Sequence, residues 1–207
     1  MVHYRLAEEH ELTQIAVLFD EAFKGYPLFS VMVSSNKSNE DFFYQMHLVN
    51  TKAYYRQHCC LVAVDGEQIV AAALLKHRDK PDIGFWDFVL AGGLKLLWSA
   101  GVSRIRNLME VMDEAKHAFV DLKEPYWYLE SFAVAPHYQS QHLGSKMIED
   151  CILPYIAKNG GGDLTLITNT DSNRIFYTKR GFSEFGESVI SRYGLEVGNW
   201  SYIIKVH

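Results

Sequence analysis

Apolar residues along the chain follow two spacings, one near 3.6 residues that is typical of helices and one of two residues or short runs that is typical of strands. Strands are predicted at residues 2–6, 60–64, 67–75, 126–134, 163–168, 183–192 and 197–206. Helices are predicted after the first strand, from Ser38 onward, within 80–123, at 142–157 and at about 172–180. The resulting order, β-α-α-β-β-helices-β-α-β-α-β-β, predicts a mixed α/β sandwich.

Turn residues mark several ends of these elements. Asp65-Gly66 separates the second and third strands and predicts a tight hairpin. The run Gly25-Tyr26-Pro27 predicts the end of the first helix, and Gly181 predicts the end of the last one. Pro154 is expected to kink or shorten the helix over 142–157, because proline has no backbone N–H to donate.

Two serines are candidate helix caps. Ser38, followed three residues later by Asp41, is a capping-box variant that predicts the start of the second helix. Ser103 is a candidate cap for a helix within 80–123, where Gly92-Gly93 weakens the helical pattern just before it. The expected inward face of that helix carries Ile105, Leu108, Met109, Met112 and Phe119.

Length and composition favour one globular domain. The chain has 207 residues, of which 48% are hydrophobic and 22% charged, and it contains no repeat or low-complexity linker. Residues 1–207 are therefore expected to form a single domain. The formal net charge of -5 provides no basic field for nucleic acid, and no cluster of Lys or Arg indicates membrane binding.

Targeting and metal signals are missing from the sequence pattern. The first residues lack an apolar signal-peptide core, and the longest apolar stretch, about 85–98, is too short to cross a bilayer. The three cysteines, Cys59, Cys60 and Cys151, do not form a disulfide framework, which fits a cytoplasmic protein. No Cys/His spacing matches a zinc site, so no metal is expected.

One segment has the form of an anion-binding site. The strand ending at Val134 leads through Pro136 into the run Gln139-Ser140-Gln141-His142-Leu143-Gly144-Ser145, which opens a predicted helix. The first N–H groups of a helix have no intrahelical partner and, with the helix dipole, bind anions such as a pyrophosphate. An ordinary strand-to-helix connection without a ligand is the alternative, and this segment alone does not decide between them.

A second segment, Asn173 to Phe182, contains two adjacent aromatic residues on a short predicted helix. Core packing is the favoured interpretation of Phe176. Tyr177 also fits a core position, although its hydroxyl would then need a buried partner.

Taken in order, the two segments resemble the GNAT superfamily of N-acetyltransferases. Val134-Ala135-Pro136 and the run from Gln139 to Gly144 are similar to its motif A, which reads Val-x-Pro and then Arg/Gln-x-x-Gly-x-Gly/Ala. Asn173 to Phe182 is similar to its motif B, Asn-x-x-Phe-Tyr-x-x-x-Gly-Phe. The predicted element order agrees along the whole chain, and the helical insert at 80–123, before the fourth strand, looks like that of a subgroup with puromycin-acetyltransferase-like enzymes.

The resemblance implies a GNAT-like fold whose two central strands, here 126–134 and 163–168, splay apart to hold acetyl-CoA. The pantetheine amides are then expected to pair with the backbone of Phe132, Ala133 and Val134 as an added strand does. A backbone N–H there would stabilise the tetrahedral oxyanion. The remaining implied acetyl-CoA contacts are Gln139, Ser140, Gln141, His142, Leu143, Gly144, Ser145, Asn173 and Phe176.

The chain departs from motif A at two positions. His142 replaces its first glycine, and Ser140 stands where glycine is common. If position 142 requires a positive φ, a non-glycine residue costs roughly 1–2 kcal/mol there. Histidine tolerates that region better than most residues, and its imidazole could donate to a phosphate. A noncatalytic acyl-CoA-binding module therefore stays open as an alternative.

The resemblance also implies the catalytic groups. Tyr177 occupies the family's general-acid position, from which it would protonate the leaving thiolate. Asn173 would bind CoA through its side-chain amide, and a helix-cap role is compatible with that. Glu130 is the candidate base, since period-two alternation places it on the same strand face as Phe132 and Val134. The alternative for Glu130 is a rim carboxylate that orders solvent or binds substrate.

The expected reaction is transfer of the acetyl group from acetyl-CoA to a primary amine, by direct attack on the thioester. A small-molecule acceptor is favoured, and a peptide or protein acceptor stays open. The acceptor pocket is expected between residues 24–57, the insert at 80–123 and the C-terminal tail. The aromatic residues of these segments include Tyr26, Phe29, Phe42, Tyr44, Phe85 and Trp86. Core packing is the favoured alternative for those rings. The exposed C-terminal strand leaves a homodimer open.

Overall fold

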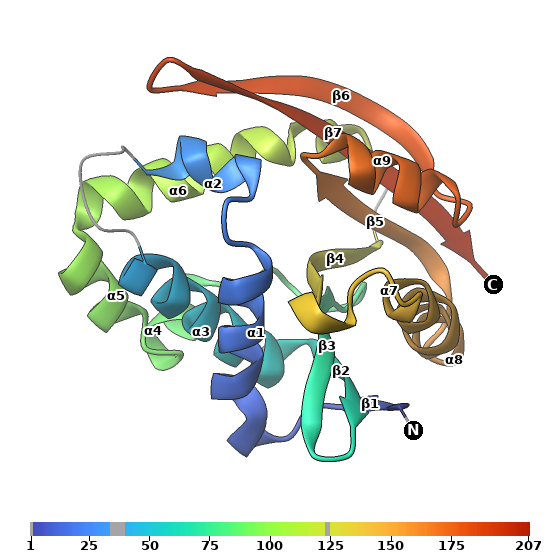
Figure 1. Ribbon diagram of the computed structural model, residues 1–207. Helices are drawn as coiled ribbons and strands as arrows, with labels where there is room; N and C mark the ends of the chain where they lie inside the picture. The colour runs from blue at the N-terminus through green and yellow to red at the C-terminus, as the bar shows by residue number, and fades with distance from the viewer. Residues whose placement is uncertain (1, 34–39, 123–124) are drawn as a thin grey trace.

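Runs of β-branched and aliphatic residues form the sheet at the centre of the molecule (Figure 1). The computed structural model describes residues 2–33, 40–122 and 125–207. One mixed sheet has the strand order β1-β2-β3-β4-β5-β7-β6, and its neighbouring strands are antiparallel except for the parallel pair β4 and β5. The strands are β1 (Val2–Leu6), β2 (Cys59–Asp65), β3 (Gln68–Lys76), β4 (Trp127–Val134), β5 (Gly162–Thr168), β6 (Ser183–Arg192) and β7 (Leu195–Val206). The predicted α/β fold with a mixed sheet is confirmed.

Helices connect the strands on both sides of the sheet. The α-helices are α1 (Leu12–Ala22), α2 (Pro27–Met32), α3 (Glu40–Gln57), α4 (Phe85–Leu90), α5 (Gly93–Ala100), α6 (Val102–Ala115), α7 (Leu143–Lys146), α8 (Leu153–Lys158) and α9 (Asp171–Thr178). Shorter 3-10 turns are η1 (Glu9–Glu11), η2 (His117–Asp121) and η3 (Pro136–Tyr138), and η4 (Met147–Ile152) is a π-helical turn.

Two hydrophobic layers cover opposite faces of the sheet. On one face, α1 and α3 pack against β2 and β3 through Ile15, Phe19 and Tyr54. On the other, the continuous helical segment α7-η4-α8 packs Met147 and Ile152 against the sheet. A third cluster joins α2, α3, α5 and α6 to the β6–β7 hairpin, which arches over them in Figure 1.

The segment between β3 and β4 is helical, as the pattern predicted, but it differs in detail. Gly92 has φ 98° and separates α4 from α5, so the Gly92-Gly93 pair breaks the helix rather than continuing it. Gly101, not Ser103, precedes the first residue of α6, and Ser103 lies inside that helix. Met109, expected to face inward, is 61% exposed, because apolar spacing alone does not show which side of a helix meets the core.

The first helix ends before Gly25 as predicted, but Pro27 then begins a second helix, α2, that the sequence pattern did not reveal. Proline suits this position, because the first N–H groups of a helix have no partner to lose. The predicted cap at Ser38 lies outside the described residues. Pro154 does not end its helix; the π-helical turn η4 comes immediately before α8, where Pro154 sits in the first turn. The wider turn accommodates a residue that has no N–H.

Across the part of the chain that the structure describes, none of the helices has the length and apolar character needed to cross a lipid bilayer.

Candidate active site

The parallel strands β4 and β5 separate soon after they meet. Their only pairs are Trp127 with Leu164 and Tyr128 with Thr165, and both strands lie wholly within the described residues. The Thr165 hydroxyl reinforces this short contact by donating to the carbonyl of Trp127 at 2.9 Å. Beyond it, β4 continues to Val134 and β5 to Thr168 without pairing with each other. The backbone groups on their facing edges are therefore available to a ligand.

A β-bulge at Glu130 accompanies the separation. On β3, Leu74 pairs with Ser131 and Leu75 pairs with Leu129, so Glu130 is the extra residue of β4. A bulge bends its strand and leaves the inserted residue unpaired. The chain therefore turns away from β5 at the point where the strand gap opens.

The bulge also changes which side chains share a face of β4. Trp127 and Leu129 belong to the cluster beneath α7-η4-α8, and Phe132 and Val134 pack against that same cluster. Glu130 instead contacts groups from α3 and the end of the insert. The expectation that Glu130 faces the same side as Phe132 and Val134 is therefore wrong, because one inserted residue shifts the alternation by one.

Glu130 has two partners on its side of the sheet. Lys116 Nζ lies 3.0 Å from Glu130 Oε2, and the Tyr54 hydroxyl donates to the same oxygen at 3.3 Å. The Lys116 ammonium also lies 4.3 Å from the centre of the Tyr128 ring. Burial, and then the charge of Glu130, raises the pKa of the Tyr54 phenol well above its ordinary value. Tyr54 is therefore a hydrogen-bond donor at neutral pH.

The run from Gln139 to Ser145 leaves β4 through two left-handed residues. Ser140 has φ 60° and His142 has φ 62°, and His142 immediately precedes the first residue of α7. The conditional prediction that position 142 needs a positive φ thus applies to this chain. The side-chain amides of Gln139 and Gln141 donate back to the carbonyls of Val134 and His137, at 3.0 and 2.8 Å. These bonds stiffen the loop, and the leading N–H groups of the helix stay available for an anion.

The two sequence motifs meet at Gly144. A Cβ added there would lie 3.4 Å from the Phe176 ring and 3.5 Å from Val134, so the start of the α7-η4-α8 segment approaches α9 closely. Phe176 is partly buried, and its ring belongs to the same cluster as Val134. The structure therefore brings together Val134, Gly144 and Phe176 from separate parts of the sequence.

Arg180 is a neighbour of this contact that the sequence analysis did not single out. Its guanidinium lies 3.7 Å from the centre of the Phe176 ring, donates to the Phe176 carbonyl at 2.7 Å and contacts the Ser145 hydroxyl. A cation is thereby held beside the first turn of α7. The sequence signal was only a basic residue next to Gly181, which is not distinctive without the fold.

Tyr177 is 7% exposed and lies among the rings of Phe176, Phe182 and Tyr202. Its hydroxyl forms no hydrogen bond with any described residue, so the partner expected for a buried phenol is not supplied by them. Burial raises the pKa of Tyr177, and the nearby phenols of Tyr26 and Tyr128 raise it further. Tyr177 therefore stays protonated at neutral pH.

Tyr26 links the α1–α2 connection to the end of β5. Its hydroxyl accepts from the backbone N–H of Asn169 at 2.9 Å and lies 3.3 Å from Thr168 Oγ1. Burial raises the pKa of Tyr26, and its hydrogen bonds with Thr168 and Asn169 act in the opposite direction. The Tyr26 ring packs edge-on against Phe23 and Phe29. Tyr26 was expected only among the rings near the acceptor pocket, and nothing in its local sequence marks the link to β5.

Asn173 does not cap its helix. Thr170 is the N-cap of α9, and its hydroxyl accepts the backbone N–H of Asn173 at 3.3 Å. The expectation that Asn173 caps its helix is therefore wrong, because Thr170 is in the cap position and Asn173 lies three residues later, inside the helix.

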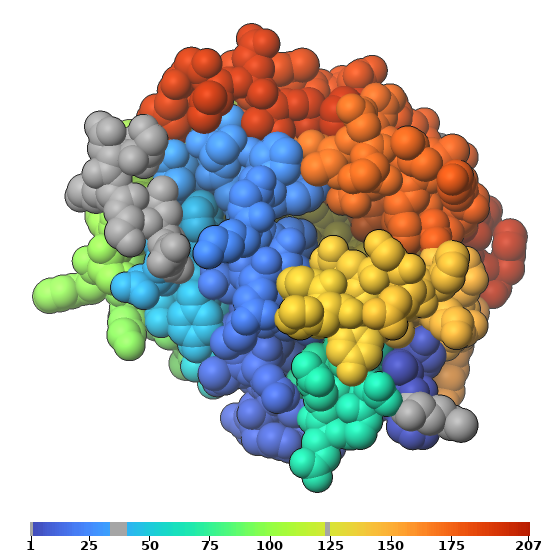
Figure 2. Space-filling view, viewed as in Figure 1, coloured from blue at the N-terminus to red at the C-terminus, as the bar shows by residue number. Residues whose placement is uncertain are grey.

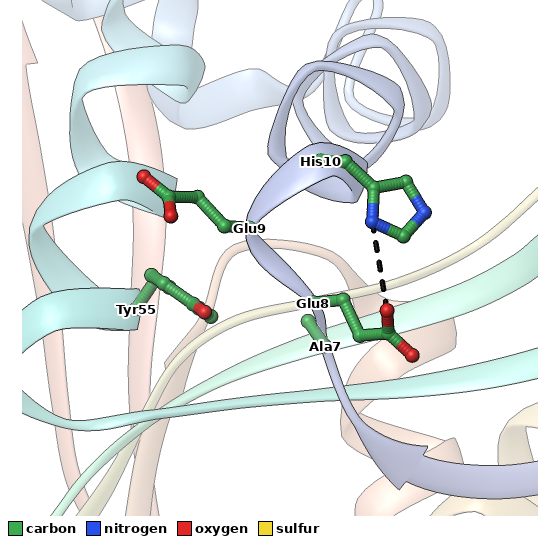
Figure 3. A pocket seen from close by; sticks show the side chains of 5 residues that line it. All are labelled: Ala7, Glu8, Glu9, His10 and Tyr55. Carbon is green, nitrogen blue, oxygen red and sulfur yellow. Dashed lines mark ion pairs between the residues drawn. The ribbon is translucent and has the colours of Figure 1, made fainter.

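The hollow above the strand gap is visible on the surface. In Figure 2, the yellow segment before α7, the orange of α9 and the blue of α1 and α2 surround a depression, with the olive colour of β4 at its floor. A different hollow, of about 640 Å³, is lined by Ala7, Glu8, Glu9, His10 and Tyr55 (Figure 3). It receives no residue from β4, β5, α7 or α9 and so lies apart from the two motifs.

Other aromatic residues expected near an acceptor fall into two groups. Phe42 is buried, whereas Phe85 and Trp86 are 65% and 73% exposed on α4. No group of three or more His, Cys, Asp or Glu side chains within 2–33, 40–122 and 125–207 is arranged to hold a metal ion.

Several solved acetyltransferase structures are similar to this chain, at low sequence identity. A histone acetyltransferase HPA2 and related acetyltransferase from Corynebacterium glutamicum is 20% identical, with a TM-score of 0.66 over 97% of this chain and 94% of that one. A polyamine N-acetyltransferase from Drosophila melanogaster is 11% identical, with a TM-score of 0.61 over 99% and 100%. The ribosomal-protein-S18-alanine N-acetyltransferase from Escherichia coli is 13% identical, with a TM-score of 0.57 over 100% and 94%.

No curated protein matches the chain significantly in sequence. The sequence profile of the Acetyltransferase (GNAT) family matches residues 22–182, which include both motifs and the insert. This match spans well over half of the chain and agrees with the separated central strands. The chain belongs to the GNAT acetyltransferase family.

Proposed function

We propose that this chain transfers the acetyl group of acetyl-CoA to a primary amine on a small-molecule acceptor, by direct attack of the amine on the thioester. The observation that carries the proposal is the separation of β4 and β5 after Tyr128 and Thr165. An unpaired strand edge in the interior of a sheet is costly unless another chain or an extended ligand pairs with it.

The residues around the gap fit an extended, phosphorylated cosubstrate. Backbone groups of Phe132, Ala133 and Val134 lie on the part of β4 that has no pairing on its β5 side, and they are suited to the amides of pantetheine. The amides of residues 139–145, with left-handed Ser140 and His142, are suited to a pyrophosphate. Arg180, held beside Ser145, adds a positive charge near that end of the site.

Acetyl-CoA supplies an activated acetyl group, and the remaining chemistry belongs to this chain. A β4 backbone N–H beyond the last pair with β5 would bind the oxygen that gains charge during attack. Tyr177 stays protonated, because burial raises its pKa, and would donate that proton to the departing thiolate. Asn173 lies on α9, the helix that also contains Tyr177, and would bind CoA through its side-chain amide.

Glu130 serves the acceptor side of the sheet. An aliphatic ammonium with a pKa near 10.4 must lose a proton before it attacks. The Glu130 carboxylate is only 14% exposed, points to the face opposite Phe132 and already binds one ammonium, that of Lys116. These features support Glu130 as the group that binds the acceptor ammonium and accepts its proton.

A thiol-release assay with acetyl-CoA and a panel of primary amines tests this proposal. Tyr177→Phe is expected to lower kcat by roughly 100-fold or more, since it removes a general acid and no hydrogen bond with the described residues. Tyr202→Phe is the matched control, because it removes a buried phenol that donates to Glu184, and it should keep most activity.

Other outcomes would redirect the proposal. Turnover on peptides with none on small amines would indicate a peptide or protein acceptor. Tight CoA binding without turnover on any amine would indicate a noncatalytic acyl-CoA-binding module. An unchanged kcat in Tyr177→Phe would remove Tyr177 from the mechanism.

A further inference from the structure

The face of β4 that holds Glu130 already contains a bound ammonium, and it comes from the protein itself. Lys116 Nζ lies 3.0 Å from Glu130 Oε2 and 4.3 Å from the centre of the Tyr128 ring. A carboxylate and an aromatic face together form a favourable site for a primary alkylammonium ion. The mechanism above gives Lys116 no role.

The two partners of this ion pair are held very differently. Glu130 is 14% exposed, sits on a strand and receives a second hydrogen bond from Tyr54. The Lys116 side chain is 34% exposed and reaches the site from the end of α6. A flexible, partly solvated lysine can move into water, whereas the carboxylate cannot leave.

The backbone next to Lys116 is fixed, so the lysine stays close even when its ammonium moves away. The Asn199 side-chain amide donates to the carbonyl of Ala115 at 2.9 Å, in a buried position. Arg192 binds Glu114 at 2.7 Å and attaches the last turn of α6 to β6. The insert therefore positions Lys116 as a permanent neighbour of Glu130.

We propose that Glu130 and the Tyr128 ring form the acceptor's ammonium site, that Lys116 occupies it in the free protein, and that the acceptor enters by displacing the Lys116 ammonium. This inference rests on the proposed function and narrows its substrate class to primary alkylamines that are cationic at neutral pH. Neutral arylamines and alcohols lack the charge needed to replace a lysine at a nearly buried carboxylate. Lys116 is thus a specificity-determining residue that competes with the acceptor.

Binding without turnover is the direct test. The full chain is saturated with CoA, which carries no acetyl group, and titrated with n-butylammonium chloride or with 1-butanol while NMR chemical shifts are followed. Lys116→Met should bind n-butylammonium roughly 5-fold or more tightly than the wild type, because the competing cation is gone. The Lys116→Met variant and the wild type should respond to 1-butanol in the same way.

Three further variants control the interpretation. Lys116→Arg keeps a cation on Glu130 and should bind n-butylammonium no better than the wild type. Arg106→Met removes an exposed cation from the same helix, where it pairs with Glu110, and should leave binding unchanged. Lys116→Gln replaces Lys116→Met if the methionine variant fails to fold.

Kinetics separate this inference from the proposed function. With acetyl-CoA, Lys116→Met should lower KM for an alkylamine and leave KM for acetyl-CoA unchanged. An n-butylammonium affinity that does not change in Lys116→Met, or that changes equally in Arg106→Met, overturns the inference even if the enzyme turns over. Ammonium binding that depends on Lys116 in a protein that acetylates no amine would uphold this inference and reject the proposed reaction.

Discussion

Two residues of the loop between β4 and α7 have backbone φ angles in a region that favours glycine. Ser140 and His142 both have φ near 60°, on either side of Gln141. A non-glycine residue in that region costs roughly 1–2 kcal/mol, and such strain is found most often where a ligand binds. The loop therefore has a shape that its own sequence does not favour, which is consistent with selection for backbone N–H placement.

Replacing His142 with glycine should stabilise the free protein slightly. The relieved strain is partly offset by the flexibility of glycine in the unfolded chain, so His142→Gly is expected to raise the free energy of unfolding by up to about 1 kcal/mol. Urea denaturation at neutral pH measures the change. Gln141→Gly is the control: Gln141 is absent from the positive-φ residues and donates to His137, so this variant should lose about 1 kcal/mol. Equal effects at both positions would argue against strain at His142.

His47 makes stability depend on pH. Its ring is 3% exposed between Phe19, Phe23 and Phe29, and burial lowers its pKa from 6.5 to about 4. The unfolded chain therefore takes up the proton first, so the stabilising effect is complete above pH 6.5 and is lost as the pH falls toward 4. The loss at acid pH is up to about 3 kcal/mol.

Denaturation curves from pH 4 to 7 test this expectation. His47→Leu should be less sensitive to acid than the wild type over that range. His58 also has a pKa lowered to about 4 by burial, so some acid sensitivity should persist in the variant. Parallel stability profiles for wild type and His47→Leu would show that folding does not lower the pKa of His47.

At the scale of single elements, α9 contains three of the expected site residues, Asn173, Phe176 and Tyr177, and the hydroxyl of Thr170 caps its first turn. The Thr170 hydroxyl accepts the N–H of Asn173, and Phe176 and Tyr177 follow within the same short helix. A helix of eight residues has little stability of its own, so its cap and its packing determine whether it forms.

Thr170→Ala should therefore affect both stability and cosubstrate binding. Loss of the cap is expected to reduce the free energy of unfolding by about 1 kcal/mol. Because Asn173 and Phe176 depend on the same helix, KM for acetyl-CoA should rise in parallel. Thr170→Ser keeps the hydroxyl and should restore both quantities, as measured by urea denaturation and steady-state kinetics. A rise in KM that serine does not reverse would exclude the cap as its cause.

Element positions were predictable where the pattern is local. The strands predicted at 60–64 and 67–75 are joined by a hairpin, as expected, but Asp65 pairs with Gln68, so the turn residues are Gly66 and Glu67 and the positive φ of 63° belongs to Gly66. The bulge at Glu130 was not predictable, because it depends on how β4 pairs with β3 and not on β4 itself. One inserted residue reversed the face assigned to the candidate base, although the strand was placed correctly.

At the scale of the whole molecule, the local motifs could be predicted from the sequence, whereas the contacts between distant segments could not. The two motifs identified the loop before α7 and the helix α9, because family residues at fixed spacing form each of them. Lys116 and Tyr26 reach the gap from the insert and from the α1–α2 connection. Their place there follows from where α6 and α1 end in space, which no residue pattern within either segment encodes.

The separated strands give a final prediction for the intact protein. Amides on the unpaired edge of β4 after Tyr128 and of β5 after Thr165 lack strand partners, and they should exchange with solvent faster than those of the β2–β3 hairpin. CoA is expected to slow exchange at 129–134 and at 139–145, because it would bridge the open edge and the loop. Hydrogen exchange followed by mass spectrometry, with and without CoA, measures this, and the β2–β3 peptides serve as the internal control. Protection restricted to 139–145 would mean that phosphate binds without insertion between the strands, and the gap would then need another occupant.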